Sequence, residues 1–156
     1  MSRGPTLPGR VAVAMSGGVD SSLAAALLRD AGWEVLGVTL QLRACDEAMA
    51  SRSCCGADGI ARARAVAGRL EIRHYVLDSV ESFSQAVLRP AWEDYAAGRT
   101  PSPCLRCNEQ IKFTAVLERG LAMDFDAVAT GHYARIVNGP NGPELHRAVD
   151  PTKDQS

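Results

Sequence analysis

The sequence contains no run of about 18 consecutive apolar residues, which is the length that a membrane-spanning helix needs. Residues 1–10 also lack the apolar core of a signal peptide. No biased tract indicates disorder, since hydrophobic residues make up 46% and charged residues 22% of the 156 residues. These absences predict a soluble, cytoplasmic protein with no membrane partner, and the length suits one folded domain.

The chain also has almost no net charge. Its 17 basic and 18 acidic residues leave a formal charge of −1, which argues against binding nucleic acid by bulk electrostatics. Any RNA contact must therefore be local. The five cysteines are an odd number in a chain without an export signal, so a disulfide scaffold is not expected. Reactive or metal-binding thiols remain open.

Short apolar runs alternate with helical patterns along the chain. Strands are expected at residues 11–15, 34–42, 73–77 and 126–130, and helices at 21–30, 57–70, 80–97 and 108–120. This alternation predicts an α/β fold, with a parallel sheet, helices on both faces and right-handed crossovers. Residues 133–137 and 144–148 flank a glycine-rich loop and predict a small β-hairpin near the C-terminus.

Three local features modify this outline. Pro90 predicts a kink or a break in the helix at residues 80–97. Residues 98–106 contain two closely spaced prolines and are expected to be irregular, after which Asn108 is expected to cap the next helix. Residues 43–56 form a polar loop with three cysteines.

The string SGGVDSS, residues 16–22, lies between the first strand and the first helix. A glycine pair there lets backbone N–H groups converge at a helix N-terminus, which makes a cradle for an anion such as phosphate. No lysine follows as in Walker A, and the spacing is not that of G-x-G-x-x-G. Asp20 would repel phosphate directly, which predicts a Mg²⁺ ion between them. The alternative is a tight turn in which Asp20 or Ser21 only caps the helix.

A second motif, TPSPCLRCN at residues 100–108, places Cys107 immediately before the expected helix cap. The helix N-terminus and Arg106 would both favour the thiolate, so Cys107 is the candidate nucleophile. A half zinc site built on C-x-x-C, or two ordinary reduced cysteines, are the alternatives.

The SGGVDSS string resembles the pyrophosphate-binding loop of the PP-loop ATP pyrophosphatases, which cleave ATP to AMP and pyrophosphate while adenylating a substrate oxygen. The resemblance implies a Rossmann-like PP-loop (HUP) domain that uses ATP and Mg²⁺. The family usually has methionine where this chain has Leu40. The implied ATP-binding residues are Ala14, Met15, Ser16, Gly17, Gly18, Val19, Asp20, Ser21, Leu40 and Gly131.

Five strings in order, SGGVDSS, CCG, GRTPSPCLRCNEQIKF, ATGHYAR and DPTKDQS, resemble the tRNA-specific 2-thiouridylase family. The resemblance covers the chain from residue 11 onward and implies ATP-dependent thiolation of the wobble uridine (U34) of tRNA. ATP would adenylate the uridine O2, and a persulfide on Cys107 would then attack the activated carbon. The implied partners are tRNAs of the Lys, Glu and Gln type and a sulfur-relay donor protein.

The same resemblance implies contacts with the tRNA or its target base. The matching residues are Ser102, Pro103, Cys104, His132, Lys153, Asp154 and Gln155. Alternatively, His132 is a strand-end histidine bonded to backbone, Lys153 is a solvated charge, and Cys54 and Cys55 are thiols without a role. Members of the family continue past KDQS with a second catalytic cysteine and a β-barrel, so residues 1–156 are expected to form the catalytic ATP-binding domain alone and to bind ATP better than they thiolate tRNA.

Other functions remain open from the sequence. Some family members carry aspartate in place of Cys104, and two thiols here plus a downstream cysteine would ligate a [4Fe–4S] cluster. A PP-loop ligase or amidotransferase acting on a small metabolite would explain SGGVDSS but leave the cysteines idle. A non-catalytic nucleotide-binding or zinc-binding module would use Cys54, Cys55, Cys104 and Cys107 as zinc ligands.

Overall fold

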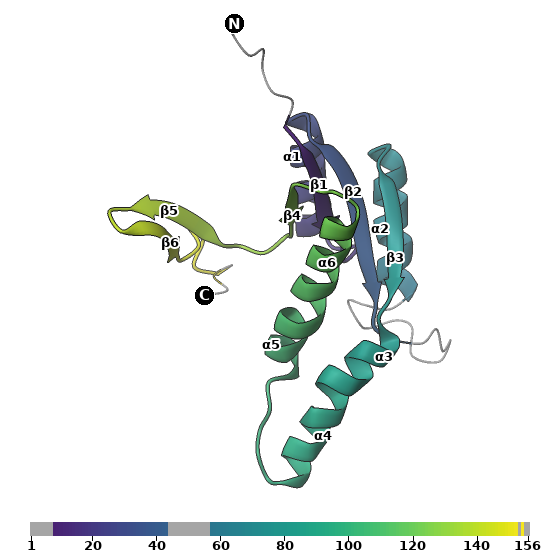
Figure 1. The fold of residues 1–156 in the computed structure, drawn as a ribbon, viewed down its shortest axis with the longest axis vertical. Helices are drawn as coiled ribbons and strands as arrows, with labels where there is room; N and C mark the ends of the chain where they lie inside the picture. The colour runs from purple at the N-terminus through teal and green to yellow at the C-terminus, as the bar shows by residue number, and fades with distance from the viewer. Residues whose placement is uncertain (1–7, 44–56, 153, 155–156) are drawn as a thin grey trace, which may run out of the picture.

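A computed structural model describes residues 8–43, 57–152 and 154. Four strands form one parallel sheet: β1 (Arg10–Ala14), β2 (Glu34–Gln41), β3 (Arg73–Asp78) and β4 (Ala127–Ala129). The spatial order is β3-β2-β1-β4, with Val11 opposite both Val35 and Ala127 (Figure 1). β1 and β2 are nearly continuous apolar runs because a central parallel strand is buried on both faces. The predicted α/β fold with a parallel sheet is confirmed.

Helices α1 (Val19–Asp30) and α2 (Ala57–Arg69) follow the first two strands. A second helical path follows β3 through α3 (Val80–Phe83), η2 (Ser84–Leu88) and α4 (Arg89–Ala96). Pro90 was predicted to kink or break this helix. A complete break is wrong, because the backbone stays helical through this path and Pro90 follows the π-helical turn η2, which divides it. A proline ring clashes with the carbonyl four residues earlier in an α-helix, and the wider π turn relieves that contact.

The third helical path runs through α5 (Pro103–Cys107), η3 (Asn108–Phe113) and α6 (Thr114–Ala122). Two predictions are wrong here. The helix begins inside the segment expected to be irregular, since proline fits the first helical position, where its missing N–H has no partner to lose. Asn108 has helical dihedral angles (φ −60°, ψ −50°) and is an interior residue, while Ser102 is the N-cap.

Apolar side chains cover both faces of the sheet, since successive residues of a strand point to opposite faces. The core beneath α1 and α2 contains Val11, Val13, Met15, Ala25, Val35 and Ala63. The core beneath the other helices contains Ala12, Leu36, Val38, Leu40, Leu42, Val87, Cys107, Ile111, Val116 and Phe125. Helices on both faces are therefore confirmed.

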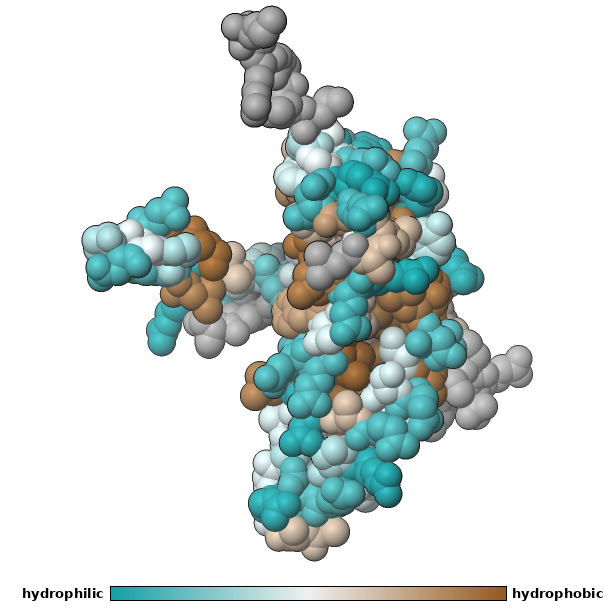
Figure 2. All heavy atoms as spheres, viewed as in Figure 1, coloured by the Kyte–Doolittle hydropathy of each residue, from teal (hydrophilic) through white to brown (hydrophobic). Residues whose placement is uncertain are grey.

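Residues 80–113 form a helical arm in which η2 packs against α5. Figure 1 shows this arm extending beyond the carboxyl ends of the strands. Hydrophilic side chains cover much of its visible surface (Figure 2). No helix among the described residues is long and apolar enough to cross a membrane.

The hairpin consists of β5 (Arg135–Gly139) and β6 (Gly142–His146) and projects to one side of the sheet (Figure 1). Its existence was predicted, but its strands reach two residues closer to the turn than expected. Gly139 pairs with Gly142, and the positive φ of Gly142 (122°) accommodates the tight turn.

Candidate functional site

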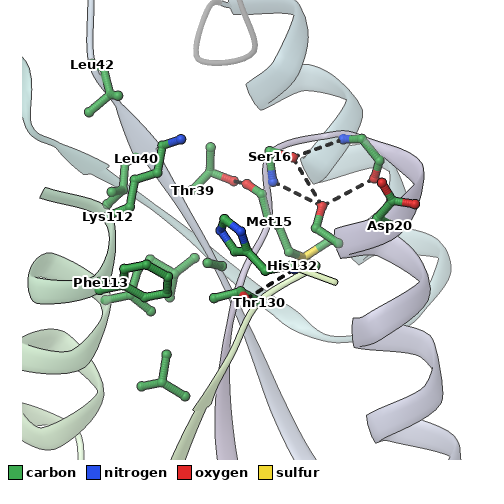
Figure 3. Close-up of a pocket in the computed structure, with 17 residues that line it drawn as sticks. Met15, Ser16, Asp20, Thr39, Leu40, Leu42, Lys112, Phe113, Thr130 and His132 are labelled. Atoms are coloured by element: carbon green, nitrogen blue, oxygen red, sulfur yellow. Dashed lines mark hydrogen bonds between the residues drawn. The ribbon is translucent and has the colours of Figure 1, made fainter. Parts of the chain in front are cut away.

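The order of the strands creates a crevice between β1 and β4. The chain passes from β1 to β2 on one side, while β4 lies on the other side of β1, and ligands of open α/β sheets bind outside the carboxyl ends of the strands at such a switch point. A cavity of about 250 Å³ lies there (Figure 3). It is lined by Ala14, Met15, Ser16, Gly18, Asp20, Ser21, Val38, Thr39, Leu40, Leu42, Lys112, Phe113, Val116, Val128, Thr130, Gly131 and His132.

The glycine loop, residues 16–18, forms one wall of this cavity. Gly17 has a φ of 77°, and a Cβ at this position would overlap the carbonyl oxygen of Gly59 at the start of α2. Arg62 of α2 donates from Nε to the Gly17 carbonyl at 3.2 Å. The sequence therefore needs glycine here because the loop lies directly against the backbone of α2.

Serine hydroxyls hold the other side of the loop. Ser21 Oγ donates to the Gly18 carbonyl at 3.3 Å and accepts the Ser16 N–H at 3.2 Å, while Ser22 Oγ donates to the same carbonyl at 2.8 Å. Gly18 is the N-cap of α1 and no side chain caps the helix, so the reading of Asp20 or Ser21 as a simple cap is wrong. The hydroxyls fix the loop's shape.

Gly131, which follows β4, closes the site from the opposite strand. A Cβ on Gly131 would lie 2.6 Å from the backbone nitrogen of Ser21, so this segment packs on the first turn of α1. Just beyond it, the Tyr133 hydroxyl donates to Asp20 Oδ1 at 2.8 Å. This hydrogen bond to the carboxylate raises the pKa of Tyr133 above its usual value.

The donor set fits a nucleotide and a divalent cation. Asp20 lines the cavity with an exposed side chain, which suits a carboxylate ligand of Mg²⁺ beside phosphate oxygens. The backbone of residues 16–18 and the start of α1 would hold the phosphates. Leu40, 9% exposed, lines the same cavity with Val38, as an apolar surface for a base requires.

A buried hydrogen-bond chain supports the end of β1. Thr39 Oγ1 donates to the Met15 carbonyl at 2.6 Å, and His74 Nε2 lies 2.8 Å from the same hydroxyl. Since the hydroxyl's only proton is already used, His74 must donate through Nε2–H. Burial, with a smaller effect from Arg64, lowers the pKa of His74. The sequence analysis did not predict a role for Thr39 or His74. The signal that could have identified them is a polar residue beside apolar ones within a strand, β2 for Thr39 and β3 for His74.

The wall facing the glycine loop comes from η3 and α6. It includes Lys112 and Phe113, and the Phe113 ring lies 5.4 Å from the His132 ring between centroids. His132 is exposed and lines the cavity. Its backbone N–H donates to Thr130 Oγ1 at 3.3 Å. Lys112 and Phe113 were not predicted as site residues, although they stand in the IKF string that follows the cysteine motif.

Neither Cys104 nor Cys107 is among the described residues that line the cavity. Cys107 is 5% exposed and packs in the core with Val87 and Ile111. It ends α5, so the predicted position at a helix N-terminus is wrong, and the exposed Cys104 occupies the first turn instead. Lys112 follows five residues after Cys107, about 7–8 Å along the helix axis. A persulfide on Cys107 would have to leave this core to react.

Two residues expected near the target base line a second cavity of about 270 Å³. Ser102 and Pro103 belong to it, together with Arg106 and the acidic Asp94 and Glu109. It lies between α4 and the start of α5, and Cys104 is not among its lining residues. The predicted contact of Ser102, Pro103 and Cys104 with the target base stays a prediction.

The remaining predicted residues are only partly described. Cys54, Cys55, Lys153 and Gln155 lie outside the described residues. Asp154 accepts the Ala148 N–H at 3.3 Å, and its Oδ2 lies 3.8 Å from Arg147 Nε. Within the described part of the chain, no three His, Cys, Asp or Glu side chains are grouped as metal ligands. The cluster interpretation also requires a downstream cysteine, and it stays a prediction.

The model of one protein family, described as tRNA methyl transferase HUP domain, matches residues 9–156. The chain belongs to this family. The tRNA-specific 2-thiouridylase MnmA of Acidothermus cellulolyticus is 56% identical over 149 residues, which cover 94% of this chain and 41% of that protein. The MnmA of Beutenbergia cavernae is 54% identical over 150 residues and is covered to 40%. The resemblance found in the sequence is confirmed, and the HUP-domain chain spans about two fifths of these relatives.

Solved structures share the fold at low sequence identity. A predicted subunit of tRNA methyltransferase from Methanocaldococcus jannaschii aligns with a TM-score of 0.52 and 21% identity over 96% of this chain and 58% of that one. A glutamine-dependent NAD+ synthetase from Acinetobacter baumannii, in complex with ADP, has a TM-score of 0.51 and 20% identity over 78% of this chain and 21% of that one. They show that the HUP-type fold recurs in these structures.

Proposed function

We propose that this HUP-domain chain binds Mg-ATP and activates the wobble uridine of tRNA for 2-thiolation. The observation that carries the proposal is the convergence of the SGGVDSS loop and Gly131 on one cavity, faced by the helix that continues from the cysteine motif. Relatives named tRNA-specific 2-thiouridylases share more than half of the aligned residues. Because the chain spans only about two fifths of them, their whole reaction enters here as part of the proposal.

In the first step, backbone amides of the glycine loop hold the two terminal phosphates of ATP. Mg²⁺ held by Asp20 would neutralise phosphate charge. The uridine O2 attacks the α-phosphorus, the new O–P bond forms, and the bond to the bridging oxygen breaks with its electron pair leaving on pyrophosphate. The N3 proton of the uracil ring is lost to water as the ring takes up the O2-substituted form. The product is an O2-adenylated uridine, in which AMP replaces a poor leaving group.

In the second step, a persulfide sulfur carried by Cys107 attacks C2 of the uracil ring. The C–S bond forms and the C–O bond to AMP breaks, which leaves the base joined to Cys107 by a disulfide. A second thiol, from a further cysteine or an added small thiol, then attacks Cys107 Sγ. The S–S bond breaks with its electron pair on the sulfur bound to C2, so that 2-thiouridine is released while a new disulfide forms on Cys107. The proposal gives Ser102, Pro103, Cys104, His132 and residues 153–155 to tRNA contacts, with tRNAs of the Lys, Glu and Gln type and a sulfur-relay protein as partners. Movement of α5 is required, because the Cys107 thiol is buried in the described conformation.

The test separates the two steps. The chain is incubated with Mg-ATP, a persulfide donor and unmodified tRNA, with a tRNA carrying cytidine at the wobble position as the control. Release of pyrophosphate that depends on the wobble uridine is the expected result of the first step, and mass analysis of anticodon nucleosides detects 2-thiouridine from the second. Pyrophosphate release that is equal with both tRNAs, or no binding of Mg-ATP, would refute the proposed function.

A further inference from the structure

The cavity is unusual in its charges. Its described lining contains one carboxylate side chain, Asp20, and one lysine, Lys112, but no arginine. The other lining side chains are hydroxyl-bearing, apolar or histidine. Only two of the chain's 17 Lys and Arg residues are lysines, Lys112 and Lys153. Lysine carries a compact ammonium group, whereas the other 15 carry a planar guanidinium group.

Lys112 lies on the wall opposite the glycine loop. Figure 3 shows its side chain beside Leu40 and across the cavity from Ser16 and Asp20. It is partly buried, and no carboxylate among the described residues pairs with it. The ammonium group is therefore available to a ligand rather than committed to a structural ion pair.

A nucleotide would leave one phosphate without a partner unless Lys112 supplied it. The loop amides and a cation on Asp20 neutralise the phosphates at the loop end of the cavity. The phosphate attached to the ribose must lie farther from the loop, between it and the apolar surface of Val38 and Leu40. An unpaired anion in such surroundings is costly, whereas a charge-assisted hydrogen bond from an ammonium group stabilises it.

We propose that Lys112 binds the α-phosphate of the nucleotide from the wall opposite the glycine loop. The site then selects phosphorylated nucleotides over nucleosides even where no pyrophosphate is present. This assignment rests on the proposed function, since it requires ATP in this cavity. The same contact is placed to hold AMP after pyrophosphate has left, because Lys112 belongs to a different wall from the residues that bind pyrophosphate.

The test measures binding of Mg-ATP, AMP, adenosine and Mg-pyrophosphate to the chain by calorimetry. The variants are Lys112→Met, which keeps the apolar stem, and Lys112→Arg, which keeps the charge. Arg119→Met is the matched control, because it removes a positive charge from an exposed position of α6, outside the cavity lining. Thermal unfolding of each variant verifies that it is folded.

The unaltered chain should bind AMP about tenfold or more tightly than adenosine, as expected for one charge-assisted hydrogen bond. Lys112→Met should abolish that preference and weaken Mg-ATP by about 10- to 100-fold, with adenosine and Mg-pyrophosphate unchanged. Lys112→Arg should restore part of the preference, and Arg119→Met should retain it.

An AMP-to-adenosine preference that survives Lys112→Met would overturn the assignment while leaving the proposed function intact. Equal weakening of Mg-pyrophosphate and Mg-ATP would also overturn it, since Lys112 would then serve the terminal phosphates. Failure of the unaltered chain to bind Mg-ATP would instead remove the proposed function, and this assignment with it.

Discussion

The glycine loop, residues 16–18, and the cysteine helix α5, Pro103–Cys107, were both recognisable motifs in the sequence, but different kinds of contact hold them in the structure. The loop is fixed by contacts with its immediate surroundings: the Gly59 carbonyl, the Arg62 guanidinium and two serine hydroxyls. The cysteine helix is fixed by packing, with Cys107 buried in the core. These contacts hold the loop's shape without a ligand, whereas the proposed reaction requires the Cys107 thiol to become accessible first.

This difference has a physical origin. A loop that binds phosphate through its own backbone works only if that backbone is already in place, so its supporting contacts are local and polar. A thiol has no such requirement until its reaction step. Burial of Cys107 should protect its thiol from adventitious oxidation, because oxidation depends on exposure as well as on thiolate character.

The largest expected effect is at the loop. Gly17→Ala places a Cβ against the Gly59 carbonyl at a positive φ, so we expect at least about a 100-fold loss of Mg-ATP affinity and about 1–3 kcal/mol lower free energy of unfolding. Gly68→Ala in α2 is the control, because a Cβ there meets nothing within 4 Å. Calorimetry and thermal unfolding measure both. Unchanged Mg-ATP affinity in Gly17→Ala would show that binding does not depend on the loop backbone conformation seen at Gly17.

The next effect concerns the buried thiol. Cys107→Ser puts a hydroxyl in an apolar core, so we expect about 1–3 kcal/mol of destabilisation, against about 0.5 kcal/mol or less for Cys104→Ser at the exposed position. Chemical denaturation measures both. Cys107→Ser should also abolish 2-thiouridine while tRNA-dependent pyrophosphate release continues. Formation of 2-thiouridine at the parent rate would show that Cys107 is not the sulfur carrier.

Accessibility itself can be measured by alkylation with iodoacetamide and peptide mass analysis. In the native chain, Cys104 should react about tenfold or more faster than Cys107, because burial withholds the thiol from the reagent. Addition of tRNA and Mg-ATP should narrow that ratio if α5 moves during the reaction. Equal alkylation rates of Cys104 and Cys107 in the ligand-free chain would contradict the burial of the Cys107 thiol.

A smaller effect is expected at the contact between α1 and the segment after β4. Tyr133→Phe removes the hydroxyl that donates to Asp20, leaving that oxygen available to a cation. The Mg²⁺ concentration that half-saturates ATP binding should fall about two- to fivefold, the equivalent of one modest hydrogen bond. Tyr95→Phe, at an exposed position of α4, is the control. A rise in that concentration would mean that Tyr133 orients the carboxylate for the cation.

The smallest expected effect is a pH dependence of the free energy of unfolding that arises from His74. Since the pKa of His74 is lowered in the folded chain, its neutral form adds stability that is present above the unfolded pKa of about 6.5 and is lost as the pH falls through the folded pKa. Denaturation at neutral and mildly acidic pH should show a slightly steeper loss for the unaltered chain than for His74→Gln, which keeps an N–H donor. Identical slopes would contradict this expectation.

Much of the fold was predictable because its signals are local. The apolar runs of β1 and β2, the helical patterns of α1 and α2, and the glycines of the hairpin each identify an element without knowledge of its neighbours. Pro90 and Pro103 were misread because a proline's effect depends on whether it lies in a helix interior, after a π turn or at a helix start. The asparagine at position 108 was misread for the same reason: a residue that can cap a helix is tolerated inside one.

The sequence by itself located the glycine loop between the first strand and the first helix and predicted that it binds phosphate, because a glycine pair there lets backbone N–H groups converge at a helix N-terminus. It also determined the family, because five motifs in fixed order are specific. Only the tertiary structure decided that Lys112, Phe113 and Thr39 line the cavity beside the glycine loop and that Cys107 does not. Which side of a helix faces a cavity depends on how that helix packs on the sheet, and packing is set by residues far apart in the chain.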